Sequence, residues 1–129
     1  MINVVEEIVT FATKCEFKDL PDDVVHETKR ILLDSIGSAL GGLSIDKGKI
    51  AVQLARQLNG SATASIVGTA NKVSYLEAAF ANGELIQALD YDAVIFPAIH
   101  VTPFVLAAPL AFAEGLHSYR HATNAPPVG

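Results

Sequence analysis

The stretch "SYLEAAFANGELIQALD", residues 74–90, decides the fold of this chain. Ser74 stands where a helix N-cap is expected, and Glu77 follows three residues later, which matches a capping box. The residues that follow are apolar nearly all round the helix, so the helix has no polar face to expose to solvent. We therefore predict a helix over 75–90 that lies in the middle of a helical protein.

Acidic residues and a histidine follow this helix in "ALDYDAVIFPAIH", residues 88–100. Helical steps place Asp90 on the face of Phe80 and Ile86, so we expect Asp90 to end a buried stripe. An ionised carboxylate there needs a partner. His100 would supply one if the intervening loop folds back onto Asp90 and Asp92. Because a carboxylate beside an imidazole can move protons, we predict that Asp90 and His100 form an acid–base pair.

Simpler interpretations of these residues stay open. The aspartates can form Asx turns, and His100 can be a core histidine that donates to a backbone carbonyl. One histidine and two aspartates can also bind a metal ion. The chain has no CxxC, HExxH or glycine-rich phosphate loop, however, so we predict no metal and no cofactor.

Helical periodicity on both sides of the central helix predicts an all-α fold, a helical bundle with one short extended segment. The further predicted helices cover 2–15, 20–42, 49–58 and 103–116, and the extended segment is "ATASIVG", residues 62–68. Gly37 interrupts the second helix and indicates that another helix passes close to it. We expect residues 1–116 to form one helical domain.

The end of the chain has its own signals. Thr102 and Pro103 predict an N-cap followed by proline at the first helical position. Pro109 predicts a kink in the last helix. From residue 117 to 129 the sequence shows no periodicity, which predicts a disordered tail.

Composition limits the class of protein. Half of the 129 residues are hydrophobic and the mean hydropathy is +0.36, so we expect the apolar surface to be covered by a partner subunit, as in a homo-oligomer, or by a missing part of the same chain. The net charge of −5 and the scattered basic residues argue against nucleic-acid binding. The apolar stretch 94–113 contains three prolines, so we expect no membrane span. The single cysteine, Cys15, and the absence of a signal peptide predict a cytoplasmic protein.

Four blocks of the sequence together resemble the MmgE/PrpD family, which includes 2-methylcitrate dehydratases and cis-aconitate decarboxylases. The blocks are "LPDDVVHETKRILLDSIGSALGG", "ASIVG", "AAFANGELIQALDYDA" and "PAIHVTPFVLAAPLAFAEGL". The resemblance implies part of a large helical domain in a homodimeric lyase. Its implied substrates are small di- or tricarboxylates, and no iron–sulfur cluster is implied. By position in the family's blocks, it implies catalytic roles for Asp90 and His100 and substrate binding by Asp92.

The chain also departs from the family pattern. Ala93, Val94 and Phe96 stand where the family usually has aspartate, threonine and histidine. Family enzymes are several times longer, so we expect a truncated chain that is inactive alone. The alternative hypothesis is a non-catalytic helical fragment or dimerisation module.

Overall fold

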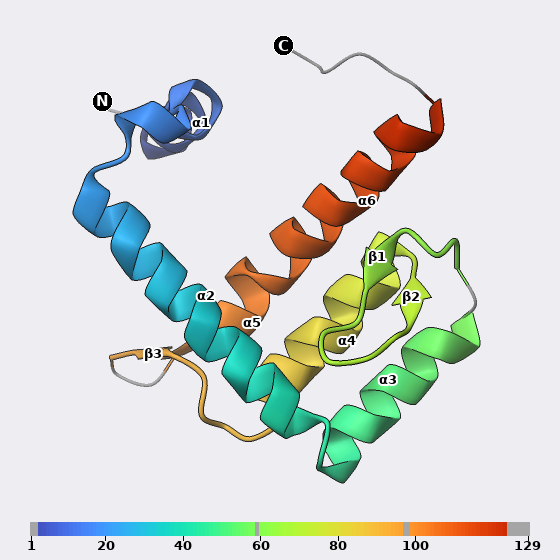
Figure 1. Cartoon of the computed structure of the whole chain (residues 1–129). Coiled ribbons are helices and arrows are strands. Elements are labelled where there is room, and N and C mark those ends of the chain that lie inside the picture. Colours follow the sequence, from blue (N-terminus) through green and yellow to red (C-terminus); the bar gives the residue numbers. More distant parts are fainter. Residues whose placement is uncertain (1–2, 59, 97–98, 124–129) are drawn as a thin grey trace. The chain divides into compact units, whose positions relative to one another are not determined.

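The computed structural model describes residues 3–58, 60–96 and 99–123, with side chains as far as residue 117. Helices dominate, which confirms the predicted all-α class (Figure 1). The helices are α1 (Val4–Lys14), η1 (Phe17–Asp19), α2 (Asp22–Gly42), α3 (Asp46–Leu58), α4 (Tyr75–Gln87), α5 (Thr102–Val105) and α6 (Ala107–Thr123). The strands are β1 (Ala64–Ser65), β2 (Lys72–Val73), β3 (Val94–Ile95) and β4 (Ile99–His100).

The chain divides into two compact units, Met1–Arg30 and Ile31–Gly129. The first holds α1, the short η1 turn and the start of α2. In α1, Glu6 and Glu7 lie in the first turn and Lys14 lies in the last, which suits the helix dipole. No residue of α1 is buried.

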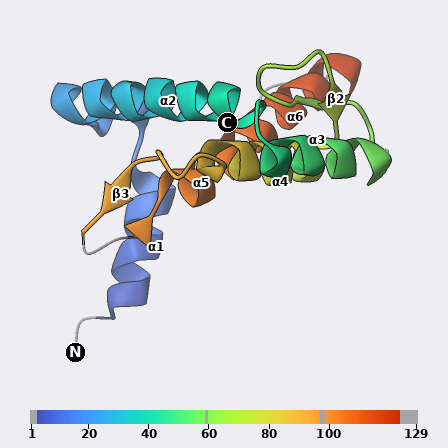
Figure 2. The same cartoon turned by 90° about the horizontal axis from the view of Figure 1, so that it is seen from below.

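The core of the second unit is built round α4, as the sequence predicted. The capping box forms: Ser74 Oγ accepts from the Glu77 backbone N–H, and Glu77 Oε2 accepts from the Ser74 N–H. Helix α4 contacts α3, α5 and α6 (Figure 1), and α3 and α4 also lie together in the second view (Figure 2). Ala78, Ala81 and Leu85 of α4 are fully buried, and the small side chains of the two alanines let its neighbours approach closely.

Close helix approach occurs at Gly42, not at Gly37. A Cβ at Gly37 would meet no atom within 4 Å, so the expectation that another helix passes there was wrong. A Cβ at Gly42 would instead collide with the Leu85 carbonyl oxygen of α4. The glycine at the end of α2 is therefore the one that packing requires.

The predicted extended segment is one strand of a hairpin. Ala64 pairs with Val73 and Ser65 with Lys72, so β1 and β2 form an antiparallel pair. The side chain of Asn82 in α4 holds this hairpin, accepting from the Val67 N–H at 2.9 Å and donating to the Ser65 carbonyl at 3.0 Å. A second antiparallel pair, β3–β4, was not predicted.

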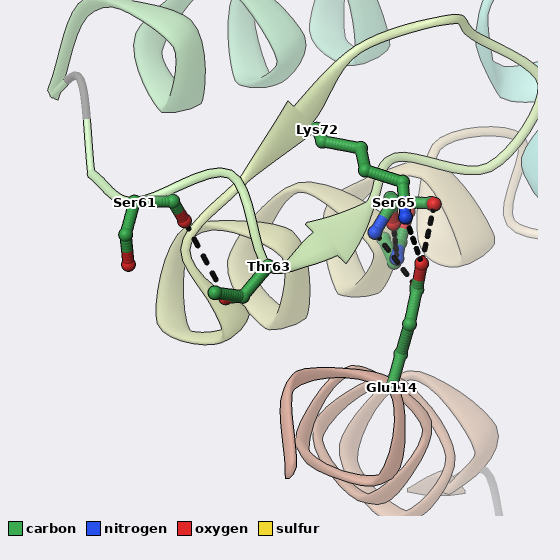
Figure 3. Close-up of polar contacts among 6 residues, drawn as sticks. Ser61, Thr63, Ser65, Lys72 and Glu114 are labelled. Carbon is green, nitrogen blue, oxygen red and sulfur yellow. Dashed lines mark hydrogen bonds and ion pairs between the residues drawn. The ribbon is translucent and has the colours of Figure 1, made fainter. Parts of the chain in front are cut away.

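Glu114 of α6 holds the same hairpin from another side (Figure 3). Its carboxylate accepts from Ser65 Oγ at 2.7 Å, from the Ser65 N–H at 2.8 Å and from Lys72 Nζ at 3.1 Å. Partial burial raises the pKa of Glu114, but the hydrogen bonds from Ser65 and the charge of Lys72 outweigh it. The pKa of Glu114 is therefore below its usual value.

The end of the described chain corrects three predicted details. Thr102 is the first residue of α5 and not its N-cap, which is Val101. Helix α5 ends at Val105 and α6 begins at Ala107, so Pro109 lies in the first turn of α6. Backbone N–H groups in the first turn make no hydrogen bond within the helix, so Pro109 does not cause the predicted kink. Helix α6 continues to Thr123, past the predicted end at Leu116, while residues 124–129 lie outside the described part. None of the described helices is long and apolar enough to cross a membrane.

Candidate acid–base site

Two local features carry the candidate residues. Helix α4 ends at Gln87, and the Asp90 N–H donates to the Gln87 carbonyl at 3.0 Å. Asp90 has a φ of 59°, the one positive φ among the described residues other than glycine. The β3–β4 hairpin then pairs Val94 with His100 and returns the chain toward the end of α4.

This return brings the three predicted site residues together. His100 Nδ1 lies 3.0 Å from Asp92 Oδ1, and His100 Nε2 lies 3.2 Å from Asp90 Oδ1. The imidazole thus lies between two carboxylates, each facing a different ring nitrogen. The hydrogen bond to Asp92 and the ion-pair contact with Asp90 differ from the interpretation of His100 as a core histidine bonded to a backbone carbonyl.

The three side chains differ sharply in burial. The side chain of Asp92 has no exposed surface, that of His100 is 28% exposed, and that of Asp90 is 78% exposed. The expectation that Asp90 ends a buried stripe was therefore wrong. Because α4 ends three residues before Asp90, the helical face that contains Phe80 and Ile86 does not extend to it. Asp92 is the buried carboxylate of the pair.

Sequence reasoning missed a fourth residue, Thr102. Its hydroxyl donates to Asp92 Oδ2 at 3.5 Å, and the residue is 3% exposed. Thr102 precedes a proline at a helix start, so its position indicated a cap. Only the β3–β4 pairing, which is not local in sequence, brings it to Asp92.

The cluster also has the composition of a metal site. Asp90, Asp92 and His100 can each offer one ligand atom, and these atoms lie within 4.8 Å of one another. A cation would need one imidazole nitrogen, but each nitrogen already faces a carboxylate oxygen. The same three side chains could therefore share a proton or hold a cation.

A separate pocket of about 110 Å³ lies among α2, α4, α6 and the loop after β1. Its polar lining groups include Ser35, Asn82 and Glu114, and each forms a hydrogen bond within the protein. The pocket does not include Asp90, Asp92 or His100, so it is distinct from the acid–base cluster.

Fold and site together define a mainly helical protein that carries an imidazole between two carboxylates. The sequence profile of the MmgE/PrpD N-terminal domain matches residues 6–123. The chain therefore belongs to the MmgE/PrpD family, which confirms the resemblance. The match includes residues 117–123, which we expected to lack pattern.

Individual relatives agree with this assignment. The chain is 28% identical over 115 residues to human cis-aconitate decarboxylase, covering 88% of this chain and 24% of that protein. It is 29% identical over 116 residues to cis-aconitate decarboxylase of Aspergillus terreus, covering 86% of this chain and 24% of that protein. A cis-aconitate decarboxylase-like protein, oryM of Aspergillus oryzae, is 29% identical over 113 residues, covering 87% and 23%. The chain thus spans about a quarter of the length of these relatives, and no solved structure gave a significant match.

Proposed function

We propose that this chain contributes the proton-transfer residues of an MmgE/PrpD-type lyase that acts on a small di- or tricarboxylate. The observation that carries the proposal is the position of His100 between a buried and an exposed carboxylate. The names of the relatives support a carboxylate substrate such as cis-aconitate.

In the proposed mechanism His100 is the acid–base group. Asp92 Oδ1 accepts the Nδ1–H, so Nε2 faces the open side of the site at Asp90. Asp90, being largely exposed, exchanges protons between Nε2 and solvent. We had predicted that Asp92 binds substrate, but its complete burial favours an orienting role.

Both lyase reactions of the family need such a group. In decarboxylation a carbon–carbon bond breaks, carbon dioxide leaves, and the remaining carbanion takes a proton. In dehydration a base removes a proton from carbon, and the leaving hydroxyl takes a proton as it departs as water. One imidazole can serve as acid or base in either case.

The open side of the site supports a role for further polypeptide. Val94 is 50% exposed and Phe96 is 92% exposed at positions where the family usually has polar groups. Within the described part of the chain, the ion pairs of Asp90 and Asp92 are to His100 alone. We propose that cations which bind the substrate carboxylates come from additional polypeptide, and that the active form is a cytoplasmic homo-oligomer.

A second candidate is a non-catalytic helical module that binds a partner. Large apolar side chains of α2 favour it, because Leu33 is 71% exposed and Leu40 is 50% exposed. The experiment that decides between the two incubates the purified chain with cis-aconitate or 2-methylcitrate and follows both by proton NMR. Turnover of either compound supports the lyase. Loss of neither, with light scattering showing a stable oligomer, supports the module and contradicts a lyase that this chain completes on its own.

A further inference from the structure

Thr102 has a hydroxyl that its local structure does not use. A threonine at the start of a helix commonly caps a free backbone N–H. Here the N-cap of α5 is Val101, and no side chain caps this helix. Thr102 is nevertheless buried, with 3% of its surface exposed. A buried hydroxyl that serves no cap needs another partner.

That partner is the far oxygen of Asp92. Thr102 Oγ1 lies 3.5 Å from Asp92 Oδ2, a long hydrogen bond that joins residues ten positions apart. Asp92 Oδ1 faces His100 Nδ1 at 3.0 Å. Each oxygen of this fully buried carboxylate thus has one partner, and a buried carboxylate oxygen without a partner would be costly.

We infer that Thr102 is a positioning residue that acts through Asp92 on His100. The hydrogen bond from Thr102 to Oδ2 restricts rotation of the Asp92 carboxylate, so that Oδ1 keeps its position opposite His100 Nδ1. Both carboxylates accept and cannot donate, but Asp90 is largely exposed and solvated by water, whereas Asp92 is fully buried and needs the hydrogen. The neutral imidazole therefore carries its hydrogen on Nδ1 and keeps a lone pair on Nε2. Nε2 is the nitrogen on the side of the exposed Asp90.

The effect on the tautomer stands on geometry alone, while any effect on turnover rests on the proposed function. A neutral imidazole can donate from either nitrogen, and the bond made by one nitrogen decides which form is populated. Losing Thr102 would release Asp92 Oδ2, and the Asp92–His100 bond would lose its fixed direction. The imidazole would then populate both tautomers.

The test compares Thr102→Val with Thr102→Ser in the full chain. Valine keeps the shape and removes the hydroxyl, while serine keeps the hydroxyl. Long-range proton–nitrogen NMR of ¹⁵N-labelled histidine reports which tautomer His100 adopts when the imidazole is neutral. The wild type and Thr102→Ser should show the Nδ1–H form, and Thr102→Val a mixture. In any variant with turnover, Thr102→Val should lower kcat about tenfold and leave KM nearly unchanged.

Several results would overturn the inference. A wild-type chain with the Nε2–H form would do so, as would a Thr102→Val chain with an unchanged tautomer. If Thr102→Val does not fold, Thr102→Ala provides the same comparison. If neither folds while Thr102→Ser does, Thr102 serves stability alone and the inference fails. A tautomer change in a chain without any turnover would support the positioning role and contradict the proposed lyase, so the two claims fail separately.

Discussion

His100 Nδ1 and Asp92 Oδ1 lie 3.0 Å apart, and the side chain of Asp92 has no exposed surface. The other nitrogen of the same imidazole, Nε2, contacts Asp90, whose side chain is 78% exposed. An ion pair in water contributes little to stability, whereas a buried carboxylate is costly to leave without its partners. The two aspartates should therefore respond differently to the same substitution.

Asp92→Asn should lower the free energy of unfolding by about 1–3 kcal/mol, since an amide cannot accept from both His100 and Thr102. Asp90→Asn should lower it by less than about 1 kcal/mol, because that ion pair is exposed. Urea unfolding followed by circular dichroism measures both. Equal losses in the two variants would contradict the assignment of Asp92 as the buried partner.

The positive φ of Asp90 should appear as backbone strain. Glycine adopts this conformation readily, while alanine in the left-handed region costs roughly 1–2 kcal/mol. Asp90→Gly should therefore be more stable than Asp90→Ala by about 1 kcal/mol. Both variants lack the carboxylate, so the comparison isolates the backbone. A more stable alanine variant would show that the turn after α4 does not have this geometry.

Two glycines of α2 should give opposite results when replaced by alanine. Gly37 has open space around it, so Gly37→Ala should raise the free energy of unfolding by about 0.5–1 kcal/mol. Gly42→Ala should lower it by about 1–3 kcal/mol, because the new methyl group meets the Leu85 carbonyl. Thermal and urea unfolding of both variants test this. Stabilisation by Gly42→Ala would refute the close approach of α2 and α4.

Glu114 should make stability depend on pH. Its folded pKa is below its unfolded value, so its contribution is fully present above the unfolded pKa. That contribution is lost as pH falls through the folded pKa. The stability difference between wild type and Glu114→Gln should therefore be largest near neutral pH and shrink in acid. A difference that does not change between neutral pH and acid would show that the ionised Glu114 does not hold the β1–β2 hairpin.

The sequence predicted what short-range chemistry determines. Ser74 and Glu77 lie within one helical turn, so their capping box and the buried helix α4 were readable from spacing. The strands are two residues long and exist only because a partner segment pairs with them, so β2 and the β3–β4 hairpin could not be read in this way. The same limit applies to the site. The sequence predicted that Asp90, Asp92 and His100 meet, but which aspartate is buried, and that Thr102 joins them, depends on where α4 ends and how the hairpin returns.

The most direct test of the account is turnover of cis-aconitate or 2-methylcitrate by the wild type, His100→Gln and His26→Gln, measured side by side. His26 is an exposed histidine of α2, so its replacement controls for the loss of a surface imidazole. The account predicts that His100→Gln lowers kcat by about a hundredfold or more while His26→Gln leaves it unchanged. Measurable turnover that is equal in all three proteins would contradict the role of His100 as the proton-transfer group.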